Sequence, residues 1–215
     1  SLAGIPLLIA DGVLLYALVP RLAGRFHPVE GLALVGGAMT YLVVRILIRK
    51  PERMYLWGHE LTHLAVAKLF LREVRGFHIT SRSGGKVVID RTNVAIDLAP
   101  YAIPLYNVVA MLPAVMLRGK HPYVAGAYLG AAAFLFSLHL HFSVEGFLDG
   151  QPDVRRSGRV FSAAVVLLFL MLWLPFLAAP AMRGGFHGLP SFYGDWTGEG
   201  IRIARGLLAG SRRLL

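Results

Sequence analysis

The sequence contains no cysteine and comparatively few charged residues. The absence of thiols excludes disulfide bonds and thiolate ligands, so a transition metal could be held only by His, Asp, Glu or water. That ligand set favours zinc in a catalytic rather than a structural style of site. Only 16% of the 215 residues are charged, whereas 56% are hydrophobic and the mean hydropathy is +0.60. Because a soluble domain of this length can bury its core with far less apolar content, we expect an integral membrane protein.

Acidic residues are also scarce: 12 Asp and Glu stand against 22 Lys and Arg, which gives a net charge of +10. Such a charge can indicate nucleic-acid binding. Here the basic residues are distributed over the connections between apolar runs, as is typical of contacts with lipid headgroups. We therefore expect the lipid bilayer, and no nucleic acid, among the partners. Residues 1–20 lack a basic leader and a small-residue cleavage site, which favours a membrane span over a signal peptide.

The apolar runs predict an all-α membrane protein with about six transmembrane helices and a small β-hairpin. The predicted spans are 2–20, 31–48, 51–71, 94–117, 122–147 and 160–180. We divide the chain into two N-terminal transmembrane helices (1–50), a membrane core (51–180), and a Gly-rich loop with a basic amphipathic tail (181–215). The prolines within 94–117 predict a kinked or broken helix. The end of the tail, 201–215, is interpreted as a short interfacial helix or a solvated tail.

The stretch 74–93 differs in character from the apolar runs around it. Val74, Phe77 and Ile79 precede a Ser/Gly cluster at 81–85, and Val87, Val88 and Ile89 follow it. Residues of these types favour strands on either side of a turn. We expect a β-hairpin, with an ordinary polar loop as the alternative.

The most specific motif is His59-Glu60-Leu61-Thr62-His63, inside the apolar run 54–70. On a helix, positions i and i+4 lie on one face, about one turn apart, so the two imidazoles can hold one zinc ion. Glu60 is then the candidate general base that faces the water on the metal. The alternative is that His59 and His63 are buried histidines satisfied by backbone carbonyls. That alternative leaves three ionisable groups in an apolar run without a cation.

A catalytic zinc usually takes three protein ligands, so one more is required. Asp149 is the first candidate because it lies at a membrane-end turn beside Gly150. Asp153 follows four residues later, and His141 shares a helix face with Asp149 if that helix continues. Each of the three could instead be a loop residue or a residue that supports a ligand.

Four of these features, in this order, resemble the site-2 protease group of intramembrane zinc metalloproteases. They are Gly58 with the HExxH motif, the hairpin with its Gly-Gly turn, Pro104-Leu105-Tyr106-Asn107, and Leu148-Asp149-Gly150 before a last apolar run. The resemblance covers about 51–180. It implies that Asp149 completes the zinc site and that the hairpin, at Val87, Val88 and Ile89, lines the path of an extended substrate. The Asn and Pro that the family usually carries before its Leu-Asp-Gly are missing here, so Asp153 and His141 remain alternatives.

The resemblance implies hydrolysis of a peptide bond in or near a transmembrane segment of a membrane protein or peptide substrate. Asn107 would then contact the substrate or the oxyanion; alternatively it pairs only with a neighbouring helix. A second hypothesis is a non-catalytic membrane subunit that keeps a structural or regulatory metal site. A third is a metal- or haem-holding protein that uses His139 and His141, although their i,i+2 spacing directs the rings to different helix faces.

Overall fold

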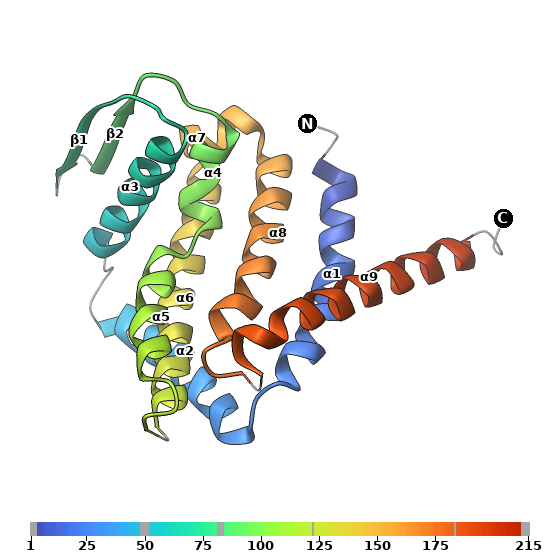
Figure 1. Ribbon diagram of the computed structural model, residues 1–215. Helices are drawn as coiled ribbons and strands as arrows, with labels where there is room; N and C mark the ends of the chain where they lie inside the picture. Colours follow the sequence, from blue (N-terminus) through green and yellow to red (C-terminus); the bar gives the residue numbers. More distant parts are fainter. Residues whose placement is uncertain (1–3, 48–51, 81–83, 122, 183, 212–215) are drawn as a thin grey trace.

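The computed structural model describes residues 4–47, 52–80, 84–121, 123–182 and 184–211, and these are mostly helical (Figure 1). In chain order the elements are α1 (Gly4–Ala23), α2 (Pro28–Leu47), α3 (Glu52–Leu69), β1 (Val74–Thr80), β2 (Gly84–Ile89), α4 (Val94–Ala102), α5 (Leu105–Leu117), α6 (Val124–Asp149), α7 (Pro152–Ser157), α8 (Arg159–Ala178), η1 (Gly185–Gly188) and α9 (Leu189–Ser211). The predicted all-α class with one small hairpin is confirmed.

Four helices, α1, α2, α6 and α8, are long and apolar enough to cross a membrane. The pair α4 and α5 adds a fifth candidate span, bent by 59° where Pro104 interrupts it. This break agrees with the kinked helix expected over 94–117. Within the described residues there are thus four or five candidate spans where the sequence predicted about six, because α3 is not among the candidates. Four of its 18 residues are charged, which lowers its hydropathy below that of the four candidate spans.

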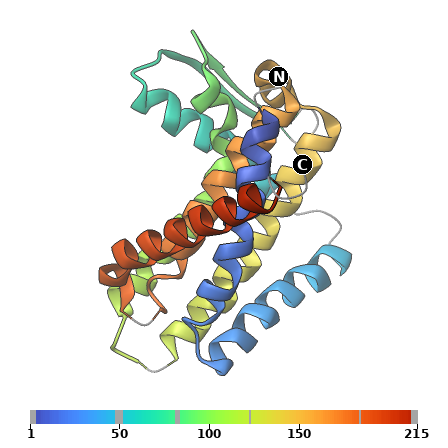
Figure 2. The ribbon, with the colours of Figure 1, turned by 90° about the vertical axis from the view of Figure 1, so that its right-hand side faces the viewer.

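Helix α6 is the axis of the bundle. It packs against α2 on one side and against α5 on another, and α2 lies along its outer face (Figure 2). The two helices approach so closely that a Cβ at Gly37 of α2 would collide with the backbone of Gly130 in α6. Small residues at such positions let membrane helices associate by close backbone packing. The small-residue content of 31–48 therefore has a direct structural use.

The two strands pair antiparallel, with Phe77 opposite Val87 and Ile79 opposite Gly85. An irregularity between Val74 and Gly76 shifts the register near the start of β1. The hairpin prediction is confirmed, while the central part of its turn, 81–83, lies outside the described residues. Together with α3, α4 and α7, the hairpin occupies one end of the bundle (Figure 1). This end holds the HExxH motif.

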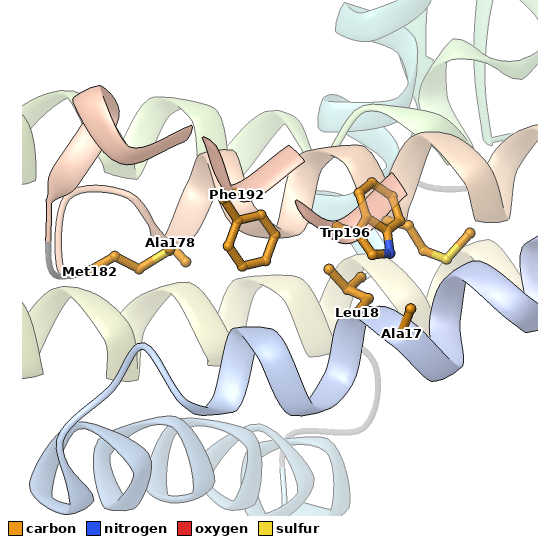
Figure 3. Packing of buried hydrophobic residues seen from close by; sticks show 7 residues of the cluster. Ala17, Leu18, Ala178, Met182, Phe192 and Trp196 are labelled. Carbon is orange, nitrogen blue, oxygen red and sulfur yellow. The ribbon is translucent and has the colours of Figure 1, made fainter. Parts of the chain in front are cut away.

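The C-terminal region differs from the predicted Gly-rich loop, because 189–211 is one continuous helix that crosses α1 and α8. Phe192 and Trp196 are buried against Leu18 and its neighbours (Figure 3). The indole N–H of Trp196 donates a 2.7 Å hydrogen bond to the backbone carbonyl of Leu14. Each glycine costs about 1 kcal/mol of helix propensity relative to alanine. Burial of two large aromatic side chains, worth roughly 1.5–3 kcal/mol each, offsets that cost.

Candidate metal centre

Three side chains from two distant elements converge on one point. His59 and His63 lie one turn apart on α3, and Asp153 approaches them from α7. The Asp153 Oδ2 atom is 3.3 Å from His63 Nε2 and 3.8 Å from His59 Nε2. One donor atom from each residue lies within 4.8 Å of the other two, so the three could hold a metal ion. We refer to His59, His63 and Asp153 as the metal cluster.

Of the two candidate aspartates, the structure places Asp153, the alternative, beside the two imidazoles. Helix α6 ends at Asp149, whose side chain is exposed, and Gly150 then adopts a left-handed conformation with φ +63°. Glycine enters this region without the cost that a Cβ imposes. Pro152 starts α7 directly afterwards, which returns the chain towards α3 and places Asp153, the alternative candidate, beside the imidazoles.

Both imidazoles are held through their Nδ1 atoms. His63 Nδ1 lies 2.9 Å from the carbonyl oxygen of Ile96, and because that oxygen only accepts, Nδ1 carries the proton. His59 Nδ1 lies 3.0 Å from the hydroxyl of Tyr55. This arrangement orients the Nε2 atoms towards Asp153, as outer partners of metal-ligating histidines do. The alternative, in which backbone carbonyls satisfy both buried histidines, therefore explains only Nδ1 of His63 and leaves its Nε2 facing Asp153.

The ionisation of the ligands suits metal binding. Burial lowers the pKa of His59, which favours the neutral imidazole that can coordinate a cation. Burial alone would raise the pKa of Asp153, but the interactions with the neighbouring imidazoles of His59 and His63 outweigh it and hold that pKa below its usual range. The metal cluster therefore offers two imidazole nitrogens and one carboxylate to a cation.

Glu60 lies beside the metal cluster rather than in it. Its side chain is buried, and β2 passes so close above it that a Cβ at Gly85 would collide with the Glu60 carboxyl group. Burial raises the pKa of Glu60, whereas the overall pKa shift of Asp153 is downward. Two neighbouring carboxyl groups with pKa values shifted in opposite directions are suited to different tasks, one as a permanent anion and one as a proton carrier. Gly85 is thus required next to the candidate base.

The metal cluster and Glu60 line a cavity of about 600 Å³. The hairpin contributes Val87 and Ile89 to this cavity, whereas Val88 lies on the other face of β2, next to Gly76. Side chains alternate between the two faces of a strand, which explains the division. Of the three predicted substrate-binding residues, the structure thus brings two to the cavity.

The remaining predicted site residues lie away from this cavity. Asn107 on α5 is buried and donates a 2.7 Å hydrogen bond from Nδ2 to the carbonyl of Ala132 on α6, which matches its helix-pairing alternative. His139 Nε2 lies 2.9 Å from the carbonyl of Tyr101. His141 Nε2 lies 3.1 Å from Arg45 Nε and 3.2 Å from the Glu145 carboxylate.

His139 and His141 thus have separate partners, as their i,i+2 spacing predicts. We refer to Arg45, His141 and Glu145, which join α2 to α6, as the arginine cluster.

Several residues of the site were missed from the sequence. Tyr55 stands one turn before His59 on the same helical face, a signal that the i,i+4 rule could have revealed. Asp97, Thr92 and Arg156 also line the cavity. They come from the start of α4 and from α7, and only the tertiary fold brings these elements together.

Comparisons of the chain with protein-family models, with curated proteins and with solved structures found no match.

Proposed function

We propose that this protein is a zinc-dependent peptidase that hydrolyses a peptide bond in or near a transmembrane segment. The observation that carries the proposal is the convergence of His59 Nε2, His63 Nε2 and Asp153 Oδ2 beside a cavity that also contains Glu60. Two imidazoles and one carboxylate are a donor set typical of catalytic zinc, whereas structural zinc sites are closed by four protein ligands. The four apolar helices support a location in the membrane.

Each residue then has a defined task. The two imidazoles and Asp153 would hold the metal, which supplies Lewis acidity and lowers the pKa of water. Glu60 takes a proton from the attacking water as its oxygen adds to the carbonyl carbon, and the proton passes to the amide nitrogen as the C–N bond breaks. The raised pKa of Glu60 favours the first of these transfers, in which it accepts the proton. Tyr55 and the Ile96 carbonyl keep the imidazoles in position.

The cavity supports an extended substrate rather than an intact helix. β2 forms one of its walls through Val87 and Ile89. β2 pairs with β1 along one edge, and an extended peptide can add along the other edge by backbone hydrogen bonds. A substrate helix would therefore have to unwind locally before its peptide bond reaches Glu60.

The substitution Glu60→Gln tests the proposal. It keeps the size of the side chain but removes the proton acceptor, so the protein should retain about one zinc per chain. Cleavage should fall by roughly 10²- to 10⁴-fold, the usual contribution of general-base catalysis. Zinc is measured by elemental analysis and cleavage with a single-span substrate in liposomes, on the same preparation.

Glu73→Gln is the matched control, because it makes the same change at an exposed carboxyl group before β1. It should leave both measurements unchanged. Cleavage by Glu60→Gln at the rate of the parent would exclude Glu60 as the base. A parent that holds zinc but cleaves no membrane substrate would favour the non-catalytic subunit with a regulatory metal.

A further inference from the structure

The two oxygens of Asp153 face different partners. Oδ2 faces the imidazoles of His59 and His63, while Oδ1 accepts a hydrogen bond from the Nη2 atom of Arg156, which lies one turn further along α7. Hydrogen bonds between a guanidinium and a carboxylate are among the stronger ones in proteins. Arg156 therefore holds the oxygen of Asp153 that is turned away from the metal cluster.

Arg156 is itself held by a second acid. Its Nη2 atom lies 3.1 Å from Asp97 Oδ1, and the hydroxyl of Thr92 donates a hydrogen bond to the same oxygen. The Asp97 side chain is only 6% exposed, whereas that of Arg156 is 51% exposed. A buried carboxylate at the start of α4 thus anchors a long and otherwise mobile side chain. Arg156 therefore links Asp97 on α4 to Asp153 on α7.

The same turn of α4 also positions a histidine. The Asn93 side chain caps α4 by accepting a hydrogen bond from the Ile96 backbone N–H, and the Ile96 carbonyl holds His63 Nδ1. The first turn of α4 therefore fixes His63 directly and Asp153 through Arg156. Two of the three members of the metal cluster depend on it.

We infer that Arg156 and Asp97 are positioning residues that restrict Asp153 to one ligand oxygen. A carboxylate can bind a cation through one or both oxygens. In a site with three protein ligands, a second carboxylate oxygen would occupy the place that the water needs. With Oδ1 bound to Arg156, only Oδ2 is free to face the cation. The inference rests on the metal site of the proposed function but not on peptide hydrolysis.

A purely structural ion pair between α4 and α7 would behave differently. Its loss would lower the stability of the protein without changing the number of atoms that coordinate the metal. A positioning pair changes the metal affinity and the coordination geometry together. Loss of an outer partner of a metal ligand typically costs 10- to 100-fold in metal affinity.

The test uses the full-length protein in detergent with two probe ions. The zinc Kd is measured by competition with a chromophoric chelator, and the visible absorption of Co²⁺ reports the coordination number, because it weakens when a fifth ligand atom is added. We expect Arg156→Gln to raise the zinc Kd roughly 10- to 100-fold and to weaken the cobalt absorption. Asp97→Asn should shift both in the same direction but less.

The double variant should bind zinc no more weakly than Arg156→Gln alone, because Asp97 acts through Arg156. Arg155→Gln is the matched control, since it removes the same charge from the exposed neighbouring position on α7. It should keep the zinc Kd and the cobalt spectrum of the parent. If Arg156→Gln fails to fold, as judged by circular dichroism, Arg156→Lys takes its place. Lysine keeps the charge but not the fork of donors, so it should also weaken zinc binding.

An Arg156 variant that folds and matches Arg155→Gln in both readouts would overturn the inference while leaving the peptidase proposal intact. If the effects of Arg156→Gln and Asp97→Asn on the zinc Kd add up in the double variant, Asp97 does not act through Arg156, and the inference is equally overturned. If the parent binds zinc and the variants show the expected shifts, but the parent cleaves no peptide, the peptidase proposal alone would be overturned. A parent that binds neither ion would overturn both.

Discussion

The metal cluster and the arginine cluster are built from the same kinds of side chain but differ in the source of positive charge. In the arginine cluster, the guanidinium of Arg45 lies 3.1 Å from His141 Nε2 and 3.6 Å from the Glu145 carboxylate. The cation is thus part of the chain. In the metal cluster the guanidinium of Arg156 contacts Oδ1 of Asp153, and Oδ2 faces two imidazoles.

This difference separates a cluster that fastens helices from one that can accept a cation. The Arg45 guanidinium pairs with the Glu145 carboxylate and so joins α2 to α6. Among the described helices, α6 has the most extensive contact with α2. In the metal cluster Arg156 pairs with Oδ1 of Asp153 only, so Oδ2 and the two imidazoles can together accept a cation. The metal cluster additionally opens on the 600 Å³ cavity, whereas the arginine cluster is not among the residues that line it.

The largest contrast between the clusters is expected from their histidines. His59→Ala or His63→Ala should abolish the expected content of about one zinc per chain, because either change leaves only two ligands. His141→Ala should keep the zinc content of the parent, because its imidazole is bound to Arg45 and Glu145. Elemental analysis of purified protein gives the result. Full zinc occupancy in a His59/His63 double variant would exclude the site.

Exchange of each cluster's acid for its amide should give the next largest contrast. Asp153→Asn removes a negative ligand and should weaken zinc binding by more than the roughly 10- to 100-fold typical of outer partners. Glu145→Gln should leave the zinc Kd unchanged. Asp149→Asn should also leave it unchanged, since that side chain is exposed at the end of α6. Weakened zinc binding in Asp149→Asn, with Asp153→Asn like the parent, would restore the sequence-based first choice.

What could be predicted from the sequence depended on how local each feature is. The placement of His59, Glu60 and His63 follows from helical periodicity alone, and the hairpin follows from strand-forming residues around a Ser/Gly cluster. The third ligand could not be chosen in this way. The Gly150 and Pro152 signals indicate that one helix ends and another begins, but which aspartate reaches α3 depends on the angle between α6 and α7.

The two structural corrections have similar causes. α3 carries four charged residues, of which only Glu60 belongs to the site, so its composition does not resemble that of a membrane span. In α9, the glycines of 184–200 suggested a loop, whereas the burial of Phe192 and Trp196 against α1 decides in favour of a helix. Tertiary packing of this kind overrides local propensity and is not visible in a short window of sequence.

The smallest effect is expected from removing the cation of the arginine cluster. Arg45→Met leaves Glu145 and His141 paired with each other but without the guanidinium that joins them to α2. Breaking a fully buried pair costs about 3–5 kcal/mol, but the Arg45 and Glu145 side chains are 26% and 33% exposed. We therefore expect the free energy of unfolding to fall by about 1–3 kcal/mol, the range for an unsatisfied polar group. Denaturant unfolding in detergent, followed by circular dichroism, measures it.

The control for this change is Arg202→Met, which removes an ion pair of 2.6 Å to Glu199 on the exposed part of α9. Exposed pairs contribute only about 0–1 kcal/mol, so its stability should stay close to that of the parent. Arg45→Met should retain zinc, because a helix-fastening cluster can weaken while α3 and α7 keep their relative positions. Loss of zinc at unchanged helical content would instead mean that α2 supports the metal cluster through α6. The two clusters would then be parts of one site, and the division of roles between them would be wrong.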